Sequence, residues 1–377
     1  MICALTILLN CLQSPIQTNV YATSNEQIYF TINTKNKTYF VTDEILRGGW
    51  WNEESQKNFR GEKSIYEIAQ DYSEKEPINY IKKNFPDIWW LVKLIKKETE
   101  QKPFDGTVMF HPGEKEHFSV EGARPGIVLD EEKLCKDILS TIKSGEYWDI
   151  SVSLREIKPK SAEKILAKLG LRGGYTTYFE SNPPREYNIN LALSKFNGLT
   201  LQNGQTVSFN KIVGPRTSER GFEEAKIILD GEFVPGVGGG VCQASTTLFN
   251  AALLAGLDID KSYNHSLAIS YVPIGRDAMV LSAADLCITN NSGGKMYFET
   301  GTVAAAGKNP GYAFVRIYGN KTNIKYKPRV EMTESELNEN EIIPARKSST
   351  YIEAWSGDKL VQSKLVRKSR YNAVTKD

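Results

Sequence analysis

The sequence predicts an α+β protein in three parts: an upstream α+β domain, a mixed α/β domain and a small β-rich C-terminal appendix. In the upstream part, alternating apolar residues typical of strands are followed by apolar residues at helical spacing. The middle part is dense in glycine and turn signals, and after Gly319 polar and apolar residues alternate to the end. With 377 residues, 40% hydrophobic and 24% charged, the chain has the composition of a globular protein of two or three domains.

The upstream part is expected to begin with a β-hairpin over 24–42, because a polar turn separates two alternating segments there. The elements expected after it are helices over 64–102, strands at 107–110 and 118–120, a helix over 131–144, a strand at 150–154 and a helix over 162–169. Glycines gather at 170–174, so we expect a linker at that point.

The second half is expected to hold one long helix over 241–255, which has an apolar face and ends at Gly256. The other elements expected there are a helix over 187–196 and strands at 205–209, 266–272, 279–281, 286–290, 295–302 and 313–318. From these elements we expect the chain to be organised in four segments. They are a signal peptide or anchor at 1–22, an upstream domain at 24–165, a central domain at 175–318 and a C-terminal extension at 319–377.

The N-terminus resembles a secretory signal. The apolar run from Met1 to Leu12 is too short to span a bilayer comfortably, and no Lys or Arg precedes it. Val20-Tyr21-Ala22 then provides small residues at the spacing of a cleavage site. We expect an extracytoplasmic protein, secreted or in the cell wall, with this segment either cleaved or kept as a membrane tether.

The charge balance excludes nucleic acid as a partner. Lys and Arg number 47 against 45 Asp and Glu, a net charge of +2, whereas nucleic-acid binding needs a basic stripe. No HExxH motif occurs, and the Cys, His and carboxylate residues do not stand at zinc-ligand spacing. We therefore expect neither a metal nor a cofactor.

Cysteine usage singles out one residue. Cleavage after Ala22 leaves three of the five cysteines, an odd number, so at least one thiol stays free. Whether Cys135 pairs with Cys287 is left open. Cys242 stands in the most conspicuous surroundings, because Gly238, Gly239 and Gly240 lead directly into the predicted helix.

A thiol on the first turn of a helix has a depressed pKa, because the free amides and the helix dipole favour an anion. Cys242 is therefore a candidate nucleophile, and the alternative is a tight turn with a small buried Cys. His265 follows on the next element and is the candidate base; otherwise it fixes the start of the next strand. Arg276 and Asp277 form either a structural ion pair or a substrate contact, and Asp277, Asp285 or neither orients His265.

At this point several motifs, in order and spacing, resemble the VanW domain. They are Gly214-Pro215-Arg216, Gly221 to Ala225, Gly238 to Leu248, His265-Ser266, Tyr271 to Ala278 and Asp285-Leu286. The resemblance covers about 175–318, and 105–162 is similar, less closely, to the peptidoglycan-binding domain that often precedes VanW domains. It implies a VanW-type α/β-mixed catalytic domain.

The resemblance also implies an activity, since some members of the family are implied to be cysteine L,D-transpeptidases. Carried over, Cys242 is the nucleophile and His265 its base. Gly239, Gly240, Ser245, Arg276 and Asp277 are expected to contact a peptidoglycan stem peptide. The acceptor is either an amine of a neighbouring stem, which gives a crosslink, or water. The alternatives are a non-catalytic wall-binding module and a surface scaffold, and a free, alkylation-prone Cys242 distinguishes the enzyme from both.

Overall fold

The computed structural model describes residues 28–46, 64–73, 75–229, 232–336, 338 and 341–375, and these fold into two compact units. The first unit reaches Thr107 and resumes over Gly122–Lys160, and the second comprises Val108–Glu121 and Ser161–Asp377. Helices and sheets occur in both, which confirms the α+β class. The predicted signal segment at 1–22 lies outside the described residues. Among the helices of the described part, none has the length and hydropathy needed to cross a membrane.

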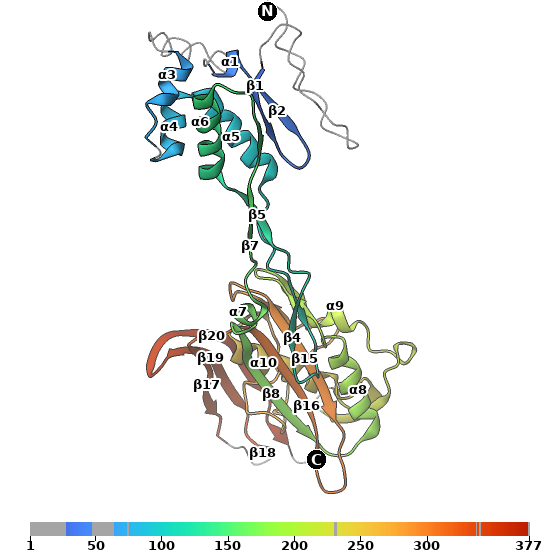
Figure 1. The fold of residues 1–377 in the computed structure, drawn as a ribbon. Helices are drawn as coiled ribbons and strands as arrows, with labels where there is room; N and C mark the ends of the chain where they lie inside the picture. The colour runs from blue at the N-terminus through green and yellow to red at the C-terminus, as the bar shows by residue number, and fades with distance from the viewer. Residues whose placement is uncertain are drawn as a thin grey trace, which may run out of the picture. The chain divides into compact units, whose positions relative to one another are not determined.

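The first unit packs helices against a small three-stranded sheet in the order β2-β1-β6 (Figure 1). Its strands are β1 (Ile28–Asn33), β2 (Thr38–Thr42) and β6 (Asp149–Ser151), with a separate pair β5 (Gly126–Leu129) and β7 (Leu154–Ile157). Its helices are α1 (Asp43–Leu46), α3 (Ile65–Gln70), α4 (Pro77–Asn84), α5 (Pro86–Thr99) and α6 (Glu131–Ser144). The predicted hairpin and the helix over 131–144 are both confirmed.

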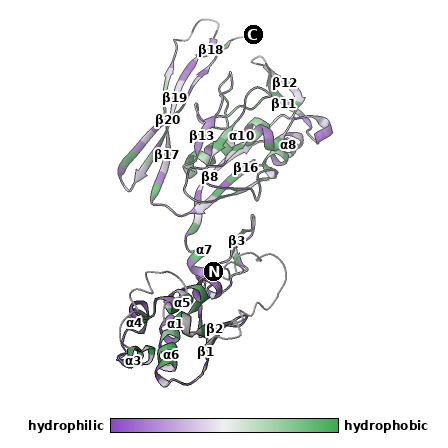
Figure 2. Cartoon of the chain, turned by 90° about the horizontal axis from the view of Figure 1, so that it is seen from above, coloured by the Kyte–Doolittle hydropathy of each residue, from purple (hydrophilic) through white to green (hydrophobic). Residues whose placement is uncertain are grey.

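The second unit is built on a four-stranded antiparallel sheet in the order β8-β16-β15-β9. Its strands are β8 (Leu169–Phe179), β9 (Thr200–Leu201), β15 (Met296–Val303) and β16 (Gly311–Asn320). Helix α10 (Val241–Ala255) lies across β8 and β16 and is buried along almost its whole length. Figure 2 shows hydrophobic residues along this helix. Its observed bounds are those predicted from the sequence.

The linker expected at 170–174 is wrong, because these residues lie inside β8. Glycine is needed there for packing rather than for a turn. A Cβ at Gly173 would stand 2.3 Å from the backbone nitrogen of Ala255, so only glycine lets α10 approach the strand this closely. The first strand of the central sheet, β8, therefore runs through the whole of the predicted linker.

The second unit also contains a series of shorter helices and strands. They are β3 (Thr107–Phe110), β4 (Phe118–Glu121), α7 (Ala162–Leu166), α8 (Pro183–Ser194), β10 (Thr206–Ser208), α9 (Phe209–Val213), the 3-10 helix Ser218–Arg220, β11 (Glu224–Leu229), β12 (Glu232–Val237), β13 (Asp258–Lys261) and β14 (Cys287–Thr289). The strands expected at 266–272 and 279–281 are absent from the described elements, and these residues form irregular loops. Phe110 and Phe118 of the β3–β4 hairpin pack on Tyr297 and Tyr318 of the central sheet.

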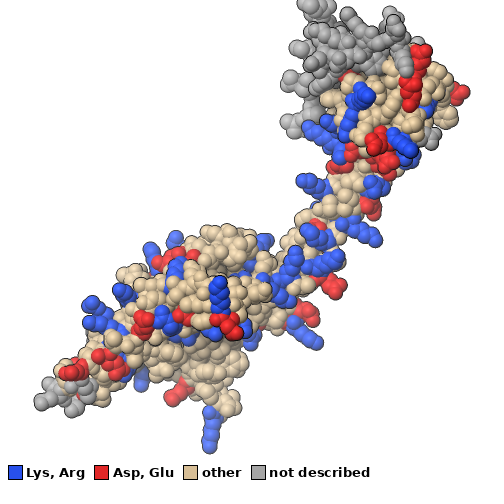
Figure 3. Space-filling view, turned by 90° about the vertical axis from the view of Figure 1, so that its left-hand side faces the viewer, with Lys and Arg blue, Asp and Glu red and all other residues tan. Residues whose placement is uncertain are grey.

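The C-terminal extension is a β structure, as predicted, but it belongs to the same compact unit as the central sheet. Its strands are β17 (Ile324–Glu334), β18 (Glu341–Ile343), β19 (Arg346–Ser356), β20 (Lys359–Tyr371) and β21 (Val374–Thr375). The sheet has the order β17-β19-β20, and β17 packs against α10. The ring of Tyr326 fills the space that a Cβ at Gly256 would need. On the face shown in Figure 3, basic and acidic side chains are interspersed.

Candidate active site

The glycine-rich turn before α10 sets the position of Cys242. Strand β12 ends at Val237, and Gly238 and Gly240 then take positive φ values of 88° and 108°, which favour glycine. A Cβ at Gly239 would stand 2.7 Å from the backbone of Ala225. The turn is therefore closed to other residues, and it delivers Cys242 onto the first turn of α10, where backbone amides and the helix dipole favour an anion.

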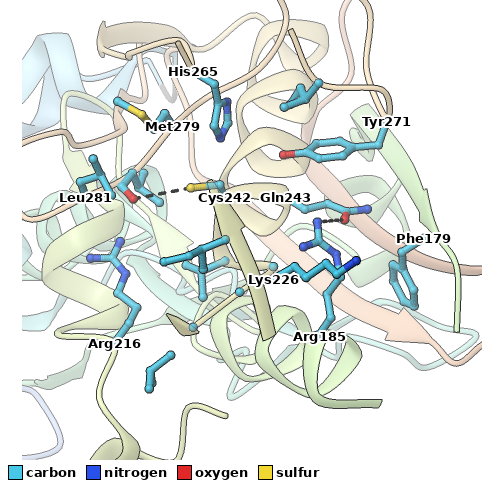
Figure 4. A pocket seen from close by; sticks show the side chains of 18 of the residues that line it. Phe179, Arg185, Arg216, Lys226, Cys242, Gln243, His265, Tyr271, Met279 and Leu281 are labelled. Atoms are coloured by element: carbon cyan, nitrogen blue, oxygen red, sulfur yellow. Dashed lines mark hydrogen bonds between the residues drawn. The ribbon is translucent and has the colours of Figure 1, made fainter. Parts of the chain in front are cut away.

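The thiol of Cys242 lies beside the ring of His265 (Figure 4). It is partly exposed in a pocket, and its Sγ is 3.6 Å from the carbonyl oxygen of Val280. His265 is 6% exposed and comes from the loop after β13. The two residues that the sequence singled out as nucleophile and base are thus brought together.

Asp277 completes the line behind His265. Its Oδ2 lies 2.7 Å from His265 Nδ1 and accepts the backbone N–H of the same residue at 2.7 Å. This double contact fixes the ring and leaves Nε2 as the atom that faces the thiol. Asp285, the other carboxylate considered for this role, lies elsewhere, where it accepts hydrogen bonds from Ser208 Oγ at 2.5 Å and from the backbone N–H of Asn210 at 2.9 Å.

The electrostatics favour a thiolate–imidazolium pair. Burial raises the pKa of the Cys242 thiol, but the hydrogen bond and charge of His265, with Val280 and Arg216, outweigh it, so the pKa is lowered. Burial lowers the pKa of His265, but hydrogen bonds with Asp277 and Cys242 outweigh it and raise the pKa to about 9. Burial raises the pKa of Asp277, but His265, Arg367 and Tyr371 outweigh burial, so the pKa is lowered. The Asp277 side chain therefore stays a carboxylate.

Two residues from the C-terminal strand β20 hold Asp277, and neither was expected at the site from the sequence. The hydroxyl of Tyr371 donates to Asp277 Oδ1 at 2.5 Å. Arg367 donates to the same Oδ1 at 3.3 Å and to the Asp277 carbonyl at 2.8 Å, and its side chain is only 8% exposed. The C-terminal extension therefore takes part in the site, because it fixes the carboxylate that fixes His265.

Three residues expected to contact substrate do not line the pocket. Ser245 is fully buried and donates to the carbonyl of Ala278 at 2.5 Å. Arg276 is directed away: its Nε donates to Asn250 at 2.7 Å, and its guanidinium lies over a tyrosine ring. Asp277 is 1% exposed and turned toward His265. Gly239 and Gly240 do line the pocket.

The pocket in front of Cys242 is large enough for a peptide. Its volume is about 1680 Å³, above the roughly 300–1,000 Å³ of a typical small-molecule site. Arg185, Arg216 and Lys226 line it, and Figure 4 shows Arg216 on one side of Cys242 and the other two on the opposite side. None of these three cations was expected at the site from the sequence, although Arg216 belongs to the Gly214-Pro215-Arg216 motif.

The other cysteines differ from Cys242. The structure places Cys135, Cys242 and Cys287 as free thiols. Burial raises the pKa of Cys135 to about 12, and burial together with Asp285 raises the pKa of Cys287. Within the described residues, no group of three or more His, Cys, Asp and Glu side chains is arranged to hold a metal ion.

The residues of this site fall in a segment that is similar to known proteins. Residues 184–308, which include Cys242, His265 and Asp277, match the family described as VanW like protein. Over these residues the chain is similar to VanW-like proteins. YoaR of Bacillus subtilis is 34% identical over 192 residues, which cover 50% of this chain and 61% of that protein.

The vancomycin B-type resistance protein VanW of Enterococcus faecalis is 28% identical over 92 residues, 24% of this chain and 33% of that protein. The chain therefore spans less than two thirds of the length of either relative. No solved structure matches the chain. Arg367 and Tyr371 lie outside the residues matched to the VanW-like family, although they contact Asp277 within them.

Proposed function

We propose that the chain is a cysteine acyltransferase acting on peptidoglycan stem peptides, an L,D-transpeptidase. The observation that carries this proposal is the line of Cys242, His265 and Asp277 at the wall of a peptide-sized pocket. A nucleophile, a base and a group that orients the base are the parts that acyl transfer requires.

In the first half of the reaction, the Cys242 thiolate attacks the carbonyl carbon of the amide that follows the diamino acid of a donor stem. The carbonyl oxygen takes up the electron pair, and amides at the start of α10 are suited to stabilise it. As the C–N bond breaks, His265 gives its proton to the departing amine of D-alanine. A thioester on Cys242 and a neutral imidazole remain.

In the second half, an amine of a neighbouring stem attacks the thioester carbonyl. His265 takes the proton that this amine loses, and the C–S bond breaks to return the thiolate. The products are a new amide crosslink and the starting thiolate–imidazolium pair. Water in place of the amine gives hydrolysis, and hence a carboxypeptidase.

The cell-wall substrate is supported by the relatives. The name of the Enterococcus faecalis protein connects it with resistance to vancomycin, an antibiotic directed at the cell wall. A wall substrate requires the site to lie outside the cytoplasm, as the N-terminal sequence predicts. In this proposal, the first unit assists by binding peptidoglycan, and residues 1–22 either direct export or tether the chain to the membrane.

The test is incubation of the protein with purified muropeptides, followed by chromatography and mass spectrometry of the products. We expect release of D-alanine together with crosslinked dimers, and loss of both in Cys242→Ala. Cys287→Ala is the matched control, because Cys287 is also a free thiol of the same unit and should be dispensable.

Binding of Cys242→Ala to purified wall, without product formation by the unaltered protein, would overturn the enzyme proposal. That result would favour a wall-binding module, in which the glycine-rich turn only shapes a pocket. Free carboxylic acid products without dimers would identify water as the acceptor.

A further inference from the structure

The two arginines of the pocket are each held by a neutral amide oxygen. A neutral amide positions a guanidinium and leaves its charge intact, whereas a carboxylate would position it and also neutralise its charge. In the described part of the chain, neither Arg185 nor Arg216 forms an ion pair with a carboxylate. Both charges therefore remain available to a ligand.

Arg216 is fixed on one side of the thiol. Its Nη2 donates to Asn210 Oδ1 at 2.5 Å, and its guanidinium lies 5.8 Å from the ring centre of Phe209. Asn210 is itself held, because its Nδ2 donates to the carbonyls of Leu281 and Ala284. Asp285 adds some attraction, but its oxygens accept bonds from other groups.

Arg185 is fixed in the same way on the opposite side. Its Nη2 donates to Gln243 Oε1 at 3.0 Å. Gln243 is 1% exposed, and its Nε2 donates to Thr177 Oγ1 at 3.2 Å and to the carbonyl of Tyr178 at 2.9 Å. Lys226 adds a second positive charge on this side, as Figure 4 shows.

Negative charge is scarce on the pocket wall. Among the described lining residues, the one acidic side chain is that of Glu180, which is exposed. Arg216 is partly desolvated, and burial lowers its pKa, so a ligand anion there would meet less screening than at an open surface.

We propose that Arg216 and Arg185 form two anion subsites on either side of Cys242, and that the acyl donor carries a carboxylate on each side of the scissile amide. This inference rests on the proposed function. A stem peptide that ends one residue after the scissile bond has a free carboxylate on its leaving D-alanine. The acyl portion supplies further carboxylates from its acidic and diamino acid residues.

The charge of the pocket is tested first without any peptide. Iodoacetate and iodoacetamide alkylate the same thiolate but differ in charge, so the ratio of their rates at Cys242 reports the local potential. Any change in the thiol pKa affects both reagents and leaves the ratio unchanged. Cys287 provides an internal reference, because it lies beside the negatively charged Asp285 rather than beside arginines.

We expect the ratio of iodoacetate to iodoacetamide rates to be higher at Cys242 than at Cys287. Arg216→Gln and Arg185→Gln should each lower it at Cys242 by about threefold, the size of one unit charge at several ångströms in water. Arg216→Lys should retain it. Lys211→Gln is the matched control, because Lys211 is exposed and does not line the pocket.

Donor peptides test the subsites themselves. Conversion of the C-terminal carboxylate of the donor to an amide should slow acylation of Cys242 by about 10- to 100-fold, the range of a charge-assisted hydrogen bond. When the arginine that binds this carboxylate is replaced by Gln, the acid and the amide donor should acylate Cys242 at the same slow rate. Amidation of the carboxylate on the acyl side should likewise have no further effect once the other arginine is replaced.

An unchanged reagent ratio in both arginine variants overturns the anion subsites, and so does equal acylation by the acid and amide donors. Failure of the proposed function gives a different result. The preference for iodoacetate would persist and depend on the arginines, while no stem peptide acylated Cys242.

Discussion

At the scale of single residues, the pair Cys242 and His265 explains why one thiol differs from the rest. The same imidazole lowers the pKa of the thiol and has its own pKa raised by it, so the charged pair is the favoured ground state. Asp277 stays ionised behind the ring and keeps it oriented.

This electrostatic arrangement predicts that Cys242 reacts with iodoacetamide faster than Cys135 or Cys287 at neutral pH. The thiolate is the nucleophile, and the pKa of the other two thiols is raised. Competitive labelling of the native protein, read by peptide mass spectrometry, checks it. Labelling of Cys242 no faster than that of Cys287 would remove the main support for a nucleophile.

The pH dependence should distinguish alkylation from acyl transfer. As pH falls through the lowered pKa of Cys242, the thiolate is protonated and both reactions stop. As pH rises through about 9, His265 loses its proton, so the leaving amine is no longer protonated and acyl transfer declines. Rate profiles should be bell-shaped for acyl transfer and reach a plateau for alkylation. If both reactions gave a bell-shaped profile, or both reached a plateau, the assignment of His265 as the proton donor would be contradicted.

The sequence could identify Cys242 and His265, because these residue types are rare and stand in unusual surroundings. It left open whether Asp277, Asp285 or neither orients His265, since spacing alone does not show which carboxylate meets the ring. Arg367 and Tyr371 gave no signal, because they reach Asp277 only through the tertiary fold. For the same reason, the sequence could not show that Ser245 and Arg276 do not line the pocket.

At the scale of elements, the helix over 241–255 was predicted with its observed bounds, because its apolar face and stop signal are local. The glycines of β8 were interpreted as a linker, because glycine marks turns as well as places where two backbones approach closely. The loops over 266–272 and 279–281 have strand-like composition, but they line the pocket without forming a described strand.

A matched pair of substitutions in β8 tests the packing of α10. Gly173→Ala places a Cβ 2.3 Å from the backbone of Ala255 and should lower the free energy of unfolding by about 1–3 kcal/mol or more. In Gly174→Ala the nearest atom outside the adjacent residues is 3.3 Å away, so a smaller loss is expected. Denaturant titration measures both. Equal losses would show that Gly173 is not the point of close approach.

At the scale of the whole molecule, each unit has its own hydrophobic core. Phe249 belongs to the core of the second unit and Ile138 to that of the first, and both are fully buried. The line of Cys242, His265 and Asp277 and the C-terminal sheet lie together in the second unit. The extension beyond Gly319 is thus part of the folded body that holds the site.

Two cores predict two calorimetric transitions. Phe249→Ala should lower the midpoint of one, and Ile138→Ala the midpoint of the other, with about 2–5 kcal/mol lost in each case. Differential scanning calorimetry of the whole chain makes the comparison. A single transition that both substitutions shift together would mean that the units unfold as one.

The central claim is that Cys242, His265 and Asp277 act as one unit. The measurement that tests it most directly is the rate at which a donor stem peptide adds mass to Cys242, followed by intact-protein mass spectrometry. His265→Gln removes the proton donor to the leaving amine, and Asp277→Asn the group that orients it, so each should slow acylation by about 10²–10⁴-fold. Because the three residues work together, the double variant should be hardly slower than either single one. Acylation of Cys242 in His265→Gln at nearly the rate of the unaltered protein would contradict the claim.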